Sequence, residues 1–190
     1  MKKGKLHMLS NHLFQRPWWV ALPLVLLCAC NHMATARESS GRNSLAIVGY
    51  NYTNRAINSF SINGQGGGDI GVSSPTSGGG GTVCCALYTP GSTVRMVNIR
   101  WQSGGCYFSK QSSLSKQMLN KLHWFYKEQE APVEILASTD ASYMEVHFYP
   151  DGSLKVAVTA HMSSPRLSLD EQRRDKTPYP RCPDDREPAQ

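Results

Sequence analysis

The amino-acid sequence predicts a mainly β protein, with an antiparallel sheet or sandwich, about one helix and structural disulfide bonds. Two observations predict this class. Short runs of β-branched and aromatic residues alternate with turn residues from residue 45 onward. Four further cysteines follow a segment that has the character of an export signal, and disulfides form and persist outside the cytoplasm.

The expected strands are short and bounded by turn residues. The runs with strand character are Leu45–Tyr52, Ala56–Ile62, Thr82–Tyr88, Thr93–Trp101, Tyr143–Tyr149 and Leu154–Val158. Pro90-Gly91 and Asp151-Gly152 are strong turn signals, and the second predicts a hairpin.

A single helix is predicted between these two groups of strands. Its expected bounds are Ser112–Lys127. The prediction rests on periodicity alone, because apolar residues recur there at helical spacing. These residues are Leu114, Met118, Leu122, Phe125 and Tyr126.

Residues 1–29 are predicted to be a lipoprotein signal peptide. They begin with a basic stretch and contain the apolar run Trp18–Leu27, which is shorter than the roughly 20 residues of a membrane-spanning helix. The sequence Leu27-Cys28-Ala29-Cys30 resembles a bacterial lipoprotein cleavage site. Cys30 is the expected lipidated residue because the small Ala29 precedes it, whereas Cys28 fits less well. A plain signal peptide with unrelated cysteines is the alternative.

The rest of the chain divides into three parts. Residues 30–44 are expected to form the lipid anchor and tether, residues 45–162 the β domain, and residues 163–190 a Pro-rich tail that Cys182 pins to the domain. The residue after Cys30 is Asn31 rather than aspartate. If lipoproteins are sorted here as in enterobacteria, this pattern implies that the protein lies on the periplasmic face of the outer membrane. The lipid on Cys30 would anchor it to that membrane.

The net charge does not indicate a nucleic-acid partner. The whole chain carries a formal charge of +6, but the signal peptide contains four basic residues and no acidic one, which leaves +2. No basic stripe with interleaved aromatic residues follows, so nucleic-acid binding is not expected.

Cys84, Cys85, Cys106 and Cys182 are expected to form two disulfides. A bond between the adjacent Cys84 and Cys85 would close a strained eight-membered ring. Its exclusion leaves Cys84–Cys106 with Cys85–Cys182, or Cys84–Cys182 with Cys85–Cys106. Zinc binding is the rival interpretation, but the spacing does not supply the ligand pairs that structural zinc sites use.

The segment Gly64–Gly81 holds two glycine clusters around a Ser/Pro/Thr-rich stretch. Gly66, Gly68 and Gly71 match the dinucleotide fingerprint formally, but that fingerprint needs a helix directly after it. Here Val72–Pro75 is extended in character, so we expect no nucleotide and no other cofactor. The segment is interpreted as a mobile surface loop. The alternative is that the glycines only allow tight turns against the sheet.

No sequence motif indicates catalysis or a metal site. There is no G-x-S-x-G elbow, and His123, His147 and His161 lack metal-binding spacing. His147 is interpreted as a surface or half-buried side chain. We therefore expect a protein that is not an enzyme, with no catalytic residues and no metal.

Four segments of the chain are similar to a known family. They are GYNYTNRAINSFSINGQGGG, SSPTSGGGGTVCC, IRWQSGGC and VHFYPDG, in this order. Together they resemble a family of proteobacterial lipoproteins catalogued as domain of unknown function 3304, over roughly Ile47–Thr159. Members of that family are often encoded beside type VI secretion effectors, notably phospholipase-like ones.

The resemblance implies, by association, an immunity protein that neutralises a toxin delivered into the periplasm. A structural or accessory envelope lipoprotein is the first alternative, and a periplasmic hydrolase without a known motif is the second. For a protein partner, the expected binding residues are Asp69, Arg95, Arg100 and Trp101, because they lie in or just after the glycine-and-cysteine region, and aromatic and arginine side chains often dominate interfaces. A place in the core is the alternative for Trp101.

Overall fold

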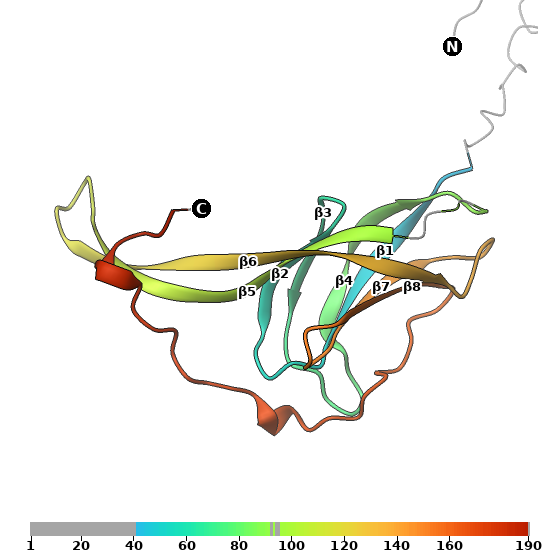
Figure 1. Cartoon of the computed structure of the whole chain (residues 1–190). Helices are drawn as coiled ribbons and strands as arrows, with labels where there is room; N and C mark the ends of the chain where they lie inside the picture. The colour runs from blue at the N-terminus through green and yellow to red at the C-terminus, as the bar shows by residue number, and fades with distance from the viewer. Residues whose placement is uncertain (1–40, 92, 94–95, 190) are drawn as a thin grey trace, which may run out of the picture. The chain divides into compact units, whose positions relative to one another are not determined.

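A computed structural model describes residues 41–91, 93 and 96–189 (Figure 1). Among these residues, eight strands form a sheet that closes as a barrel in the order β1-β4-β3-β2-β5-β6-β8-β7. Their bounds are β1 Asn43–Asn51, β2 Ile57–Ile62, β3 Gln65–Ile70, β4 Gly79–Tyr88, β5 Met96–Gln111, β6 Met118–Ile135, β7 Tyr143–Phe148 and β8 Leu154–Thr159. The predicted mainly β class is confirmed.

The predicted signal peptide, Cys30, and the tether up to residue 40 lie outside the described residues. In the part that is described, no helix has the length and apolar character needed to cross a membrane.

The sheet is mixed rather than purely antiparallel. Two neighbouring pairs, β1 with β7 and β6 with β8, run parallel, and the other pairs run antiparallel. The reason is the β7–β8 hairpin, which inserts between β1 and β6 and closes the barrel. Each of its strands points the same way as its outer neighbour.

The barrel interior is the main core. Alternate residues of β1, β7 and β8 point inward, as the period of two in a strand requires. Met144, Val146 and Phe148 of β7 meet Leu45 and Ile47 of β1 there. The intervening residues of β1 and β7 point outward, where a second apolar cluster forms around Val48, Tyr50 and Tyr52.

The predicted helix over Ser112–Lys127 is wrong. Residues 112–117 turn the chain, and β6 then pairs with β5 from Met118 opposite Gln111 to Pro132 opposite Met96. We call the part beyond the barrel, residues 102–126, the ribbon. Both of its faces carry apolar side chains, and apolar residues at both parities of a strand can imitate the helical period.

The expected mobile loop over Gly64–Gly81 is also wrong. Half of this segment is strand, because it contains all of β3 and the start of β4, and residues 71–78 connect these two strands. The glycines allow close packing. A Cβ on Gly67 would overlap the ring of Phe60, one on Gly78 would overlap the ring of Tyr50, and one on Gly79 would overlap the Gly71 carbonyl.

The disulfide pairing differs from both expected connectivities. The pairs are Cys106–Cys182 and the adjacent Cys84–Cys85. The strand order explains this, because Cys84 and Cys85 lie on β4 beside β1 and β3, whereas Cys106 lies in the ribbon. A bulge also places both Cys84 and Cys85 opposite the single residue Ala46, so the strict alternation expected of a strand does not hold there.

The C-terminal residues 163–189, which we call the strap, run along the outside of the barrel and end beside the ribbon (Figure 1, orange to red). Leu167 and Leu169 pack on the outer apolar cluster. Further along, Arg173 donates to the carbonyls of Ser73 and Asn51. Cys182 then donates its backbone N–H to the carbonyl of Tyr107 on β5, next to the Cys106–Cys182 disulfide.

The glycines of β4 give a matched test of this packing. Gly79 has a φ of +92° and faces the Gly71 backbone, whereas Gly81 has open space where a Cβ would lie. We expect Gly79→Ala to lower the free energy of unfolding by about 1–3 kcal/mol, because the backbone strain and the overlap both oppose the side chain. Chemical denaturation should show a change smaller than about 1 kcal/mol for Gly81→Ala. Equal stability of the two variants would contradict the packing described here.

Candidate functional site

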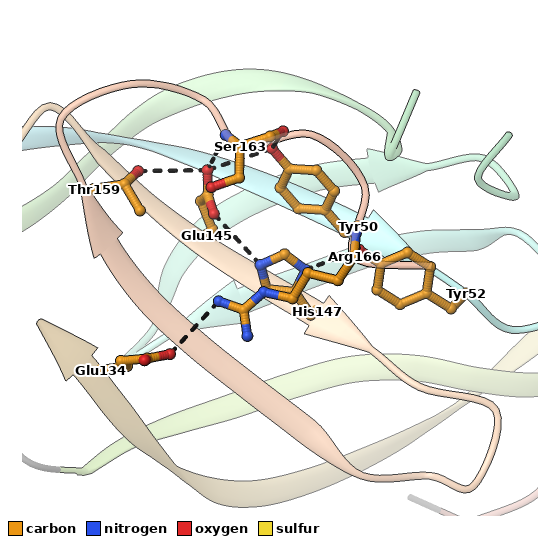
Figure 2. Close-up of polar contacts among 8 residues, drawn as sticks. All are labelled: Tyr50, Tyr52, Glu134, Glu145, His147, Thr159, Ser163 and Arg166. Atoms are coloured by element: carbon orange, nitrogen blue, oxygen red, sulfur yellow. Dashed lines mark hydrogen bonds and ion pairs between the residues drawn. The ribbon is translucent and has the colours of Figure 1, made fainter. Parts of the chain in front are cut away.

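Two features of the described residues have the chemistry of a site. The first is a buried polar cluster between the outer face of the sheet and the strap (Figure 2). The second is an exposed arginine–aromatic patch at the base of the ribbon.

The buried cluster begins with the alternation of two parallel neighbours, β1 and β7. Tyr50 of β1, Tyr52 just after it, and Glu145 and His147 of β7 all point away from the barrel core. An outward-facing residue would ordinarily be solvated. Glu145 and His147 are nevertheless 0% exposed, because the strap crosses over them.

The Glu145 carboxylate is held mainly by one oxygen. Its Oε1 accepts a hydrogen bond of 2.7 Å from the Ser163 backbone N–H. Longer contacts come from the Thr159 hydroxyl at 3.4 Å and the Tyr50 hydroxyl at 3.3 Å. The Tyr50 hydroxyl donates more closely to the Ser163 carbonyl, at 2.6 Å. Ser163 therefore attaches the strap to the sheet through both of its backbone polar groups.

His147 lies between Glu145 and Tyr52. Its Nε2 lies 3.4 Å from Glu145 Oε2, and its Nδ1 lies 3.1 Å from the Tyr52 hydroxyl. That hydroxyl also accepts a 2.7 Å bond from the Arg166 backbone N–H, so its own proton is free to be donated to Nδ1. These partners place the imidazole proton on Nε2, facing the carboxylate. The ring stacks on Tyr50 with 4.4 Å between centroids.

The environment keeps His147 neutral and Glu145 ionised. Burial lowers the pKa of His147, and the Glu145 carboxylate 3.4 Å away only partly offsets this. Burial raises the pKa of Glu145, but the His147 imidazole beside it and the hydrogen bond from Ser163 outweigh this, and the pKa of this carboxyl lies below its ordinary value. Burial, reinforced by Glu145, also raises the pKa of Tyr50.

This cluster connects the strap to the barrel. Both ring nitrogens of His147 face partners inside the protein, and Ser163 takes part through its main chain rather than its hydroxyl. The sequence interpretation of His147 as surface or half-buried is therefore corrected. A pattern of alternation cannot reveal that a distant segment covers the outer face.

The exposed patch forms where the ribbon leaves the barrel. Arg100 of β5 places its guanidinium 3.8 Å from the centroid of the Tyr126 ring on β6. Tyr126 is 41% exposed and the adjacent Phe125 is 40% exposed. Together with His123 and Trp124 they line a shallow hollow of 320 Å³. The patch therefore offers a cation, aromatic faces and a concave surface in one place.

The structure separates the four expected binding residues. Arg100 is exposed and belongs to the patch, whereas Asp69 is exposed on β3, two strands away in the sheet. Trp101 is half-buried and packs edge-on against Phe148 of the core. Arg95 lies outside the described residues. Sequence reasoning missed Tyr126 as a partner of Arg100, because the helix predicted there hid the pairing of β5 with β6.

Comparison with known proteins gives a family match. Residues 50–156, more than half of the chain, match the sequence profile of a family described as "Protein of unknown function (DUF3304)". No curated protein and no solved structure matches the chain. Within the described residues, no group of three or more His, Cys, Asp or Glu side chains is placed to hold a metal ion.

The buried cluster predicts how stability depends on pH. The pKa of His147 in the folded chain lies below the ordinary 6.5, so between these two values the unfolded chain binds a proton that the folded chain does not. The free energy of unfolding should therefore fall as the pH drops below about 6.5, by up to about 1.4 kcal/mol per pH unit. The contribution of Glu145 has the same sign but is lost only at lower pH, below its ordinary 4.5.

Denaturation of His147→Gln from pH 7 to pH 5 tests this dependence. We expect the free energy of unfolding of this variant to lack the decrease that His147 causes between pH 6.5 and pH 5, whatever the variant's absolute stability. His161→Gln is the control, since His161 is exposed, and it should keep the slope of the natural chain. A natural chain with equal stability at pH 7 and pH 5 would show that His147 is not held neutral by burial.

Proposed function

The chain belongs to this family of proteins of unknown function, and we propose that it is an envelope-anchored lipoprotein that acts as a binding module. In this proposal it is an immunity protein that neutralises a type VI secretion effector of the phospholipase-like class. It sits on the periplasmic face of the outer membrane, bound through a lipid on Cys30. The role is that of a binding protein rather than an enzyme.

The Arg100–Tyr126 pair carries the proposal. Arginine and tyrosine are among the residues that most often dominate the free energy of protein–protein binding. Stacking of the Arg100 guanidinium on the Tyr126 ring holds both long side chains in one exposed arrangement. Because these side chains are already ordered, they lose less conformational entropy on binding than mobile side chains would.

The backbone under the patch is also well supported. Continuous pairing of β5 with β6 runs through the patch. The strap reinforces the ribbon through the Cys106–Cys182 disulfide and through Tyr179, whose ring packs edge-on against Trp124. A rigid presenting element favours tight binding, because little conformational entropy is lost when the partner docks.

The leader sequence and the disulfides also support a location in the cell envelope. The leader with its Cys30 site directs the chain to the envelope. Disulfides persist in that compartment, and the domain carries two cysteine pairs. A lipid on Cys30 would keep the binding module where a delivered phospholipase reaches its substrate, the membrane.

Co-expression with a toxin tests the proposal. The natural chain and a periplasm-directed phospholipase-like effector from the same gene neighbourhood would be produced together, and survival would be scored. We expect the natural chain to protect. We expect Arg100→Ala and Tyr126→Ala each to weaken binding by about 2 kcal/mol or more, roughly 30-fold in Kd, as removal of a hot spot does.

Lys155→Ala is the matched control for the loss of an exposed basic side chain, because Lys155 lies on β8 away from the patch. It should protect fully. Cys30→Ser, which removes the expected lipid site, should release the protein from membranes and reduce protection. If the natural chain binds no effector and gives no protection, a structural or accessory envelope role takes the place of immunity.

A further inference from the structure

The two edges of the ribbon differ. On the β5 edge, the strap adds a parallel bridge between Arg181 and Tyr107. On the opposite edge, β8 joins β6 only from Val133 onward. Over Met118–Pro132, β6 pairs with β5 alone among the described residues. That edge presents a row of backbone N–H and C=O groups, which is a template for another strand.

The apolar side chains on this open edge are arranged symmetrically. The exposed large ones on the β6 part of the ribbon are Met118, Leu119, Phe125 and Tyr126, at 64%, 37%, 40% and 41% exposed. Met118 and Tyr126 lie at equal distances in sequence from Leu122, and so do Leu119 and Phe125. The edge therefore has the pattern expected of a surface that pairs with itself about Leu122.

We propose that the β6 edges of two copies of this chain pair antiparallel about a two-fold axis at Leu122, which joins the two ribbons into one sheet. In this register Met118 lies opposite Tyr126 of the second copy, and Leu119 lies opposite Phe125 of the second copy. Leu122 meets its own counterpart. Cross-strand pairs between aromatic and aliphatic side chains are stabilising, and this register provides four such pairs around the axis.

The charges permit this register. Lys121 falls opposite His123 of the second copy and Asn120 falls opposite Trp124, so no two lysines and no two carboxylates face each other directly. Continued into the turn, the same register brings Lys116 beside Glu128 of the second copy. Between Gln102 and Lys127 the sequence contains lysines and no carboxylate, so Glu128 is the nearest acidic partner along β6.

The tip of the ribbon also gains a contact. Leu114 at the turn is 94% exposed. Antiparallel pairing about Leu122 carries this turn alongside residues 127–129 of the second copy, which border a pocket of 420 Å³ that Trp101 and Phe148 also line. The turn that carries the most exposed leucine of the described chain is thereby brought beside a hollow with a mixed polar and apolar lining.

A second copy fits this edge better than an unrelated strand, because the four exposed large apolar residues match their own mirror order. Two-fold pairing of identical surfaces is also the commonest way in which soluble chains assemble. Edge pairing leaves both faces of the ribbon open except where Met118 of the second copy lies beside Tyr126. The pairing uses the backbone edge of β6 and is independent of the proposed toxin-binding role.

Cross-linking of the purified full chain tests the axis. In Leu122→Cys the two new thiols lie directly opposite each other across the axis, within disulfide range. Oxygen with copper–phenanthroline should oxidise them to one disulfide, and a reducible dimer should appear on a denaturing gel. Asn120→Cys is the control on the same face, since its two copies lie about 14 Å apart along the strands. It should remain monomeric on the same gel.

Light scattering coupled to gel filtration gives the independent readout. The natural chain should elute with the mass of a dimer. Phe125→Lys should raise the dissociation constant at least about tenfold, because it removes the contact with Leu119 and places a charge diagonal to Lys121 of the second copy. Met162→Lys adds the same charge at an exposed position on the strap side of the barrel, and it should remain dimeric.

Three results would overturn the proposal. The first is a natural chain that is monomeric at every concentration tested. The second is equal cross-linking of Leu122→Cys and Asn120→Cys. The third is a Phe125→Lys variant that is folded by circular dichroism and dimerises as tightly as Met162→Lys.

Discussion

A buried carboxylate is the group on which this structure depends most. Glu145 is fully buried and ionised, and an unpaired charge in that position would be strongly destabilising. The sheet supplies Thr159, Tyr50 and His147, but the closest donor is the Ser163 N–H of the strap, at 2.7 Å. The strap is thus a required layer of the fold. Its continuation to Cys182 connects the covered face of the barrel with the ribbon.

The strap divides the outer surface into covered and open parts. Over β1 and β7 it buries tyrosines, a histidine and a carboxylate, and two of the tyrosines and the carboxylate hydrogen-bond to the strap. Over the ribbon it caps the β5 edge at Tyr107 and leaves the β6 edge open. The exposed aromatic residues Phe125 and Tyr126 lie on β6, the strand with that open edge.

The sequence predicted the barrel strands other than β3 well, and β3 and the ribbon poorly. Runs such as Tyr143–Phe148 have one apolar face and a clear turn after them, so local chemistry defines them. In Met118–Tyr126 apolar residues occupy both faces of an isolated strand pair, and this pattern also suits a helix. Gly78 and Gly79, where β4 begins, were misread because their role is contact with Tyr50 and Gly71, which lie near only in the folded barrel. For the same reason, neither the Glu145–Ser163 contact nor the Cys106–Cys182 pair could be derived from spacing.

Amide hydrogen exchange at the strap is the most direct test that this segment is an integral layer. The Ser163 N–H bonds to Glu145 and the Arg166 N–H bonds to the Tyr52 hydroxyl. Both amides should exchange slowly, with protection close to that of the barrel strands, whereas the exposed Ser164 between them should exchange fast. Exchange of Ser163 and Arg166 at the rate of Ser164 would contradict the account, because the strap would then open independently of the barrel.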